Sequence, residues 1–356
     1  MDHAFGTGAP FTVGIEEELM LVDPETHALA PVAARVLGEI ASQDGFEAAH
    51  EVYAAQIELR SPPAATADGA VRALRAGRAA ARAAGATLLG AGIHPAAELG
   101  DAPIVDADRY RRCVADMRGL MQRTPEAALH VHVGMPDPDA AIRAFNCLRA
   151  QLPLVQALAA GSPYWFGRDS GLASARFFLT RGYPARGVPP AFRDLGDYEE
   201  HLRSLAAGGG PDDYTLVWWD VRPHPRLGTV ELRELDAQAS LDDDAAIAAL
   251  VRALAVEAAE GRAPDPPPRE AIEWSAFRAA RDGLDAEVLH DGSPAPVREV
   301  ARAVVGRLRG TGSDPALDGV ERILRDGGSA DRQRAAHARG GMPALLAHLV
   351  EATAAA

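Results

Sequence analysis

The chain has 356 residues, a formal net charge of −14 at pH 7 and a hydrophobic content of 47%. This length and composition predict a globular protein with a substantial core, in one large domain or two. The excess of acidic residues disfavours binding to nucleic acids and to anionic membranes, because both recruit clustered positive charge. We therefore expect a partner that is a small molecule or another protein.

The sequence contains no lysine, so all 36 basic residues are arginines. A Walker A loop uses a lysine on the phosphates, and pyridoxal enzymes and covalent adenylyl ligases use a lysine amine. The composition excludes these mechanisms. Any phosphate group that the chain binds has to be neutralised by arginine or by a metal ion.

The distribution of apolar residues predicts no membrane segment. We find neither a basic segment followed by an apolar run at the N-terminus nor an uninterrupted stretch of about 18 apolar residues. The two cysteines, Cys113 and Cys147, lie in helical patterns, so no disulfide framework is predicted. We expect a soluble cytoplasmic protein.

Strand-like and helical patterns alternate over the first 240 residues. Period-two patterning predicts strands at 11–22, 51–61, 87–93, 127–134 and 214–235. Helical patterns rich in Ala, Leu and Arg lie between them, at 31–43, 66–86, 106–121 and 138–160. The segment 161–213 is rich in Gly, Pro and Arg and predicts a long ordered loop, which is often a functional feature.

The chain after Asp242 is predicted to be almost wholly helical, with breaks at "APDPPPRE" and "HDGSPAP", where proline ends helices. Together the patterns predict an α+β fold on an antiparallel sheet. Residues 1–240 would form the α+β region, and residues 241–356 a helical region packed on the same domain. A parallel nucleotide-binding sheet is disfavoured, because no glycine-rich turn joins a strand to a helix.

The stretch FTVGIEEELMLV at 11–22 places three glutamates in an apolar run. Alternation along a strand puts Glu16 and Glu18 on one face and Glu17 on the opposite, apolar face, so we expect Glu17 at a bend or an edge. Two buried carboxylates one pleat apart are costly unless cations compensate them. The stretch therefore predicts metal ligands, and the alternative is the solvated face of an exposed strand.

Three further segments repeat this design of one apolar and one polar face. The residues on their polar faces are Gln56, Glu58 and Arg60, then His130 and His132, then Thr229, Glu231 and Arg233. Four such strands indicate one polar cavity lined by a sheet. Carboxylate-rich sites with one or two imidazoles and no thiolate favour Mg²⁺ or Mn²⁺ over zinc.

Arginine side chains accompany these strands. Arg222, Arg226 and Arg233 lie close to Glu231, and "FGRDSG" contributes Arg168. Guanidinium groups match carboxylates and phosphates in geometry and charge, although Arg226 also fits a surface role. The adjacent Trp218 and Trp219 are expected in the core or in the cavity wall.

At these residues the sequence resembles the carboxylate-amine ligases of the glutamate-cysteine ligase type 2 family, relatives of glutamine synthetase. The matching pieces run in order from residue 11 to about 240: "VGIEEELMLVD", "EVYAAQIELRSPP", "LHVHVG", "GSPYWFGRDSGLAS" and "VWWDVRPHPRLGTVELRELDAQ". The resemblance implies a glutamine synthetase-like catalytic region. Its antiparallel sheet would form a funnel between ATP and an amino-acid substrate, with Mg²⁺ bridging them.

The resemblance also implies roles for individual residues. One ion would be held by Glu18, Glu51 and Glu58, and a second by Glu16, His130 and Glu231. His132 would approach the ATP phosphates, and Arg233 the transferring phosphoryl group or the substrate carboxylate. Substrate binding would involve Arg222 and Arg168. Because Glu51 is out of phase with Glu58, the two can face one ion only through a bulge or an intervening turn.

The implied reaction has two steps. The γ-carboxylate of glutamate attacks the γ-phosphorus of ATP to give an acyl phosphate, and the amine of cysteine or another compound then displaces phosphate. Metal ions and arginines can supply the charge neutralisation without a lysine. Family members form dimers, so we expect a homodimer.

Three other functions fit parts of the pattern. A metal-dependent amidohydrolase would use His130 and His132 as zinc ligands, but it would need a further His and Asp set. A kinase would stop at phosphoryl transfer to an amine or guanidino group. A nucleotide-binding regulatory protein on a degenerate ligase scaffold would bind nucleotide without turning it over.

Overall fold

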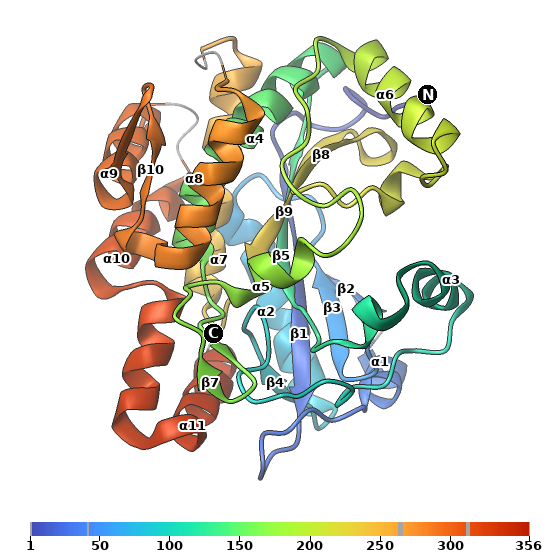
Figure 1. The fold of residues 1–356 in the computed structure, drawn as a ribbon, viewed down its shortest axis with the longest axis vertical. Coiled ribbons are helices and arrows are strands. Elements are labelled where there is room, and N and C mark those ends of the chain that lie inside the picture. Colours follow the sequence, from blue (N-terminus) through green and yellow to red (C-terminus); the bar gives the residue numbers. More distant parts are fainter. Residues whose placement is uncertain (1, 41–42, 263–265, 311–313, 356) are drawn as a thin grey trace.

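The computed structural model describes residues 2–40, 43–262, 266–310 and 314–355. Within these residues the centre of the molecule is a seven-stranded antiparallel sheet in the order β2-β3-β1-β5-β9-β8, with β4 paired to the far end of β1 (Figure 1). The strands are β1 Val13–Val22, β2 Glu47–His50, β3 Gln56–Arg60, β4 Thr87–Leu89, β5 Ala128–Gly134, β8 Val221–His224 and β9 Thr229–Asp236. The predicted antiparallel sheet is confirmed.

Two of the predicted strands are interrupted in the structure. The segment 51–61 contains only β3, which pairs with β2 across a turn at residues 51–55. The segment 214–235 contains short 3-10 helices at Tyr214–Leu216 and Pro225–Leu227, so it forms two strands. Gly228 joins them with a φ of 67°, where a Cβ would meet the Ala4 carbonyl oxygen at 2.4 Å. Glycine is therefore required at this turn.

The helices predicted in the first half are confirmed, with shifted ends. They are α1 Ala33–Ile40, α2 Ala67–Ala83, α3 Asp108–Met117 and α4 Pro138–Ala159. Residues 41–42 of the first predicted helix lie outside the described residues. The third prediction, 106–121, also includes part of a 3-10 helix at Arg118–Gln122.

The prediction of a long loop at 161–213 is wrong in part. The segment contains the two-stranded hairpin of β6 Tyr164–Trp165 and β7 Arg168–Asp169, and the helices α5 Ala175–Thr180 and α6 Leu195–Ala207. Ser174 and Asp194 cap the two helices by accepting hydrogen bonds from the backbone N–H groups of Phe177 and Asp197. These N-caps start helices within a Gly- and Pro-rich composition that indicates a loop.

The chain after Asp242 is helical with one exception. Its helices are α7 Leu241–Ala259, α8 Arg269–Asp282, α9 Val297–Leu308, α10 Gly319–Asp326 and α11 Ser329–Ala355, with short 3-10 helices at Gly283–Asp285 and Pro315–Asp318 and a kink in α11 at Gly340 and Gly341. Residues 287–296 form the hairpin of β10 Glu287–His290 and β11 Ser293–Pro296, which the helical prediction missed. Asp291 and Gly292, both at positive φ, make its turn, as an Asp-Gly pair favours.

The apolar face of the sheet packs on α2, α4 and α7 and forms the main core. Ile15 and Leu19 of β1, Leu59 of β3 and Val131 of β5 are fully buried in it. Cys113 and Cys147 are free and buried, which confirms the absence of a disulfide. Among the described residues, none of the helices is long and apolar enough to cross a membrane.

Glu17 occupies the centre of the sheet, so the prediction that it sits at a bend or an edge is wrong. It pairs in register with Leu59 on one side and Leu129 on the other, and its side chain enters the apolar core. There Arg78 of α2, which has no exposed surface, donates to both Glu17 carboxylate oxygens at 2.6 to 3.1 Å. This buried ion pair supplies the compensation that a carboxylate requires inside a core.

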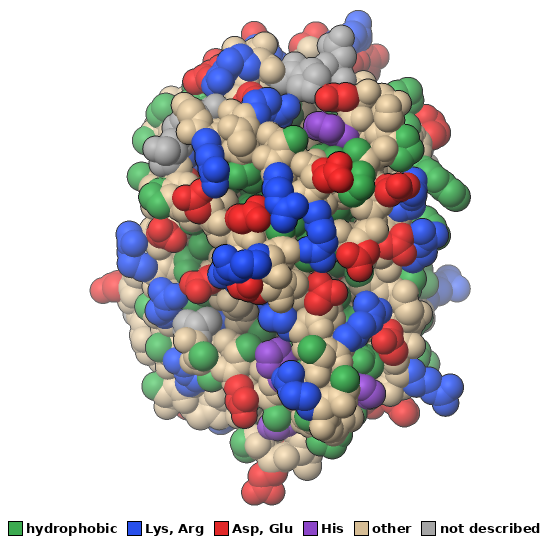
Figure 2. Space-filling model, turned by 90° about the vertical axis from the view of Figure 1, so that its left-hand side faces the viewer, with side chains coloured by type: hydrophobic (Ala, Val, Ile, Leu, Met, Phe, Trp, Pro, Cys, Tyr) green, Lys and Arg blue, Asp and Glu red, His purple; other side chains and the backbone are tan. Residues whose placement is uncertain are grey.

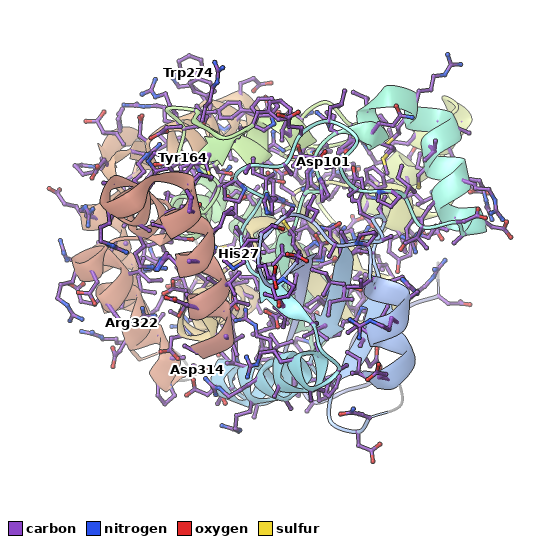
Figure 3. The ribbon with its side chains drawn as sticks, turned by 90° about the horizontal axis from the view of Figure 1, so that it is seen from below. His27, Asp101, Tyr164, Trp274, Asp314 and Arg322 are labelled. Atoms are coloured by element: carbon purple, nitrogen blue, oxygen red, sulfur yellow. The ribbon has the colours of Figure 1, made fainter. Side chains whose placement is uncertain are left out.

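The C-terminal helices are tied to the same region. Arg78 also donates to the carbonyl oxygen of Thr353 in α11, and the Thr353 hydroxyl accepts from the backbone N–H of Gly90 at 3.0 Å. Asp314 lies beside the start of α2 and accepts from the backbone N–H of Ala67 at 2.7 Å (Figure 3). These contacts link α2, the edge of β4 and the C-terminal region.

The side of the molecule with α9 and α10 carries basic and acidic side chains interspersed with one another (Figure 2). Ion pairs join Arg302 to Glu321 and Arg309 to Asp318 across these elements. No broad patch of a single charge is visible on this face, and its exposed pairs contribute little to stability.

We expect the Arg78→Met variant to lose about 3–5 kcal/mol of unfolding free energy, because it leaves the Glu17 carboxylate buried and unpaired. Urea denaturation measures the loss. The double variant Glu17→Leu/Arg78→Met should recover the part of the loss that is due to Glu17, whereas Asp244 and the three backbone carbonyl oxygens still lose their contact with Arg78. Arg75→Met, at an exposed position of α2, is the matched control, and a loss in Arg78→Met no larger than in this control would contradict the assignment.

Candidate active site

The polar face of the sheet lines a cavity of about 630 Å³. Side chains from β1, β3, β5, β8 and β9 form its floor, and residues of α3, α5 and the segment 213–227 form its walls. Past Glu18 the same face of β1 is covered instead, because Met20 and Val22 pack in a cluster with Leu345 and Leu349 of α11. The cavity therefore occupies the part of the sheet where the polar residues lie.

Among the described residues, two groups of three potential metal ligands lie in this cavity. The first group is Glu16, His130 and Glu231, whose ligand atoms lie within 4.8 Å of one another. Glu16 and His130 are opposite in the β1–β5 register, and the distance from His130 Nδ1 to Glu16 Oε2 is 3.2 Å. Strand pairing thus brings together residues that are 114 positions apart.

The second group is Glu18, Glu58 and His130, so His130 belongs to both. Glu18 and Glu58 face each other in the β1–β3 register. Glu51 also lines the cavity, from the turn after β2. Glu51 therefore reaches the cavity through an intervening turn, as its sequence phase required. It does not belong to either of the two groups of close ligands.

The protein compensates the carboxylates of the second group only in part, because Arg60 donates to Glu58 and the Ala128 backbone N–H donates to Glu18. Burial raises the pKa of Glu18 to about 7 and that of Glu58 to about 8, and repulsion from neighbouring carboxylates adds to both shifts. Burial and the nearby Glu18 raise the pKa of Glu51 to about 7. A bound cation would favour the ionised form of all three.

The first group is compensated by cationic neighbours. Burial alone would raise the pKa of Glu231, but Arg222 and Arg233 hold it well below its ordinary value. Arg222 Nε lies 2.7 Å from Glu231 Oε2, and Arg233 donates to the other oxygen. His132 Nε2 is buried without a hydrogen-bond partner, at 3.5 Å from Glu16 Oε1 and 3.7 Å from Glu231 Oε1.

The residues present fit a hard divalent cation. Both groups offer carboxylate oxygens with one imidazole and no thiolate, which is the donor set of Mg²⁺ or Mn²⁺. Burial raises the pKa of Glu18 and of Glu58 even though Arg60 donates to Glu58, and a bound cation would oppose both shifts. The orphaned nitrogen of His132 faces the same space and is available to an anionic group such as a phosphate.

Arg168 is the predicted site residue that the structure places elsewhere. It is exposed on the β6–β7 hairpin and does not line the cavity. The reason is local, because the Phe166–Gly167 turn, with both residues at positive φ, folds this segment back on the surface. Arg226 does line the cavity but is largely exposed, and Trp218 forms part of the wall while Trp219 is buried.

Sequence reasoning missed the charged residues that line the end of the cavity beside α5, which are Arg176, Arg186 and Glu126. It also missed Glu234, which pairs with Arg186 and does not itself line the cavity. Glu234 escaped detection because a bulge at Arg233 and Glu234 shifts the β5–β9 register between Leu129 and Val131. The bulge lets Glu234 join the polar side, where Arg186 Nη2 donates to it at 2.6 Å. The helix cap at Ser174 was the available signal for α5, which carries Arg176.

Comparisons with known proteins agree with this architecture. The model of a family described as glutamate-cysteine ligase family 2 matches residues 12–348. A Rubrobacter xylanophilus protein assigned as a glutamate-cysteine ligase 2-3 is 41% identical over 99% of this chain and 100% of its own length. A second protein of that organism, assigned as a glutamate-cysteine ligase 2-1, is 36% identical over 96% of this chain and 95% of its own length.

A solved structure shares the fold at low identity. The glutamate-cysteine ligase of Francisella tularensis in complex with AMP superposes with a TM-score of 0.74 and 15% identity, over 97% of this chain and 89% of that chain. At this identity the likeness establishes the fold. It confirms the predicted fold class, in which an antiparallel sheet carries the site.

Glu51→Gln should stabilise the protein in EDTA at pH 8. The folded state holds the Glu51 proton more tightly than the unfolded chain, so ionising it costs folding free energy as the pH rises from about 4.5 through 7. Removing this cost should raise the melting temperature by roughly 2 °C at pH 8 and leave it unchanged at pH 4. Added Mg²⁺ should stabilise the variant less than the parent. Differential scanning fluorimetry measures both effects.

The matched control is Glu47→Gln, which neutralises an exposed carboxylate on β2. We expect it to behave like the parent in EDTA and in Mg²⁺. A Glu51→Gln variant that is less stable than the parent at pH 8 in EDTA, or that gains as much from Mg²⁺, would contradict the role of Glu51 in a carboxylate group that the protein compensates only in part.

Proposed function

Because the chain belongs to glutamate-cysteine ligase family 2, we propose that it is an ATP-dependent carboxylate-amine ligase that joins the γ-carboxylate of glutamate to the amine of cysteine or a related compound. The observation that carries the proposal is that one cavity contains both oxygen-rich ligand groups together with Arg222 and Arg233. This combination neutralises phosphate and carboxylate charge in the absence of any lysine.

Two ion sites follow from the ligand groups. Glu18 and Glu58, with Glu51 from the neighbouring turn, would hold one Mg²⁺, and Glu16, His130 and Glu231 would hold a second. When bound, Mg²⁺ supplies neutralisation of the nucleotide phosphates and of the carboxylate under activation. The register of β1 with β3 and β5 aligns these side chains before any ligand enters.

In the first proposed step, a γ-carboxylate oxygen attacks the γ-phosphorus of ATP. The bond from that phosphorus to the bridging oxygen breaks, ADP leaves, and an acyl phosphate forms. Arg233, which donates to Glu231, would neutralise charge on the transferring phosphoryl group or the substrate carboxylate. His132, whose Nε2 has no hydrogen-bond partner, would approach the phosphates. Positioning and charge neutralisation are the main needs of phosphoryl transfer.

In the second step the neutral amine attacks the carbonyl carbon, the bond to the phosphate oxygen breaks, and the amine loses a proton. Arg222, held by Glu231 and by the Thr215 carbonyl oxygen at 2.9 Å, is placed to bind the substrate. This two-step reaction requires no covalent nucleophile on the protein. We also propose that the protein is a homodimer and that it is cytoplasmic.

We expect purified protein to release ADP from MgATP and L-glutamate in the presence of its amine, tested as a panel led by cysteine. Glu16→Gln and Glu231→Gln should each lower this rate by roughly 100-fold or more, because each removes charge that positions the transferring group. A coupled ADP assay measures the rate. Arg168→Gln, which changes an exposed arginine outside the cavity, should keep the parent rate.

Analysis of the product by mass spectrometry separates the alternatives. An amide formed with ADP and phosphate supports the ligase, whereas a phosphorylated amine or guanidino compound identifies a kinase. Amide hydrolysis without ATP would point to a hydrolase. Tight nucleotide binding without turnover on any pair would overturn the proposal in favour of a regulatory protein.

A further inference from the structure

The end of the cavity beside α5 carries guanidinium groups with buried N–H donors that form no hydrogen bond within the described residues. Arg176 of α5 and Arg186 line the cavity, and their side chains are 4% and 7% exposed. Arg176 Nε and Nη1 and Arg186 Nε are buried and have no hydrogen-bond partner. Helix α5, whose Arg176 lines the cavity, lies in front of the sheet near β5 (Figure 1).

Burial alone would lower the pKa of Arg176, but the charges of Glu234, Asp236, Glu18 and Glu126 raise it, and none of these carboxylates is hydrogen-bonded to Nε or Nη1. Asp236 accepts from the hydroxyls of Ser162 and Ser174 at 2.7 and 3.0 Å and from the Gly161 backbone N–H at 2.9 Å, while Arg176 Nη1 stays 3.7 Å away. Unused donors on a buried cation are costly, so their presence indicates an anionic ligand that completes them.

Two acidic groups near Arg186, Glu234 and Asp220, are engaged as well, and Arg186 Nε stays 3.9 Å from Asp220 Oδ1. Glu234 accepts from Arg186 Nη2 at 2.6 Å and from the Thr180 hydroxyl at 3.3 Å. Arg181, directly after α5, donates two hydrogen bonds of 2.8 Å to the carboxylate oxygens of Asp220. The free N–H of Arg186 and those of Arg176 therefore remain as donors in this part of the cavity.

A carboxylate at the same end of the cavity can accept further hydrogen bonds. Glu126 lines the cavity, and its closest polar neighbours are Arg123 Nη2 and the Tyr183 hydroxyl, both at 3.5 Å. Burial raises its pKa, and Arg176 and Arg123 oppose that shift, which places Glu126 within electrostatic reach of the free guanidinium. The pocket thus presents donors for an anion beside an acceptor for a cation.

We propose that Arg176 and Arg186 bind the α-carboxylate, and Glu126 the α-ammonium group, of the amino acid that serves as the acid substrate. This inference rests on the proposed ligase function. A zwitterion satisfies both sets of groups at once. A phosphate dianion would satisfy the guanidinium groups but would be repelled by Glu126 and Glu234.

The chemistry identifies this ligand as the acid substrate and not the amine. An ammonium group beside Glu126 stays protonated and is therefore a poor nucleophile, which suits the amine that must not react. Arg176 also acts electrostatically on Glu18, a member of the second ligand group. A side chain that extends from the head group along β1 would carry its distal carboxylate toward Glu18 and His130.

The test uses three acids that share the reacting carboxylate. L-Glutamate has both head-group charges, glutarate lacks the ammonium, and 4-aminobutyrate lacks the α-carboxylate. Isothermal titration of the full chain with Mg²⁺ and without nucleotide measures their binding. We expect the parent to bind L-glutamate roughly 10-fold to 100-fold more tightly than either of the other two acids.

Each variant should lose one preference and keep the other. Arg176→Gln should bind L-glutamate and 4-aminobutyrate with similar affinity but still prefer L-glutamate over glutarate. Glu126→Gln should lose the preference over glutarate alone.

Circular dichroism and melting temperature verify folding, and Glu126→Gln tests the proposal if Arg176→Gln fails to fold. Arg168→Gln and Glu47→Gln, with the same charge changes outside this end, should match the parent.

Binding and turnover separate this proposal from the ligase proposal. Selective binding with no ADP release under any condition would support the subsite and overturn the ligase function. ADP release with both preferences intact in Arg176→Gln and Glu126→Gln would support the ligase function and overturn the subsite. A parent that binds none of the three acids, or binds them equally, would also overturn the subsite.

Discussion

The two faces of β1 handle buried negative charge in opposite ways, and the site depends on this difference. On the core face, Glu17 is neutralised within the protein by Arg78. On the cavity face, Glu18 and its partner Glu58 on β3 are compensated only in part, although Arg60 donates to Glu58, and burial raises the pKa of both. The core face therefore carries a closed ion pair, whereas a cation on the cavity face would favour the ionised form of both carboxylates.

Charge is also ordered along the cavity. The carboxylates of β1 and β3 lie at the acidic part, Arg222 and Arg233 surround Glu231 on β9, and Arg176 and Arg186 lie at the far end. In a chain without lysine, every one of these cations is a guanidinium group. Such groups keep their charge when buried and present several donors in a plane, so they suit sites for carboxylates and phosphates.

The helices support the site without entering most of it. Helices α2, α4 and α7 cover the core face of the sheet, and α11 covers the end of β1 beyond Glu18. Arg78 connects these layers, because it contacts Glu17 on β1 and the carbonyl oxygens of Gln238, Ala239 and Thr353. Helices α3 and α5 are the exceptions, since residues of both form cavity walls, among them Arg176 of α5.

The sequence by itself determined the antiparallel α+β class and the face on which Glu16, Glu18, Glu58 and Glu231 lie. These follow from the two-residue period of a strand, which is a local property of the backbone. Tertiary structure alone decided three other features: the pairing of Glu17 with Arg78, the bulge that turns Glu234, and the entry of Arg176 into the cavity wall. They depend on which distant segments meet, and Glu17 and Arg78 are 61 positions apart. Local periodicity carries no information about such contacts, because packing selects them only when the chain has folded.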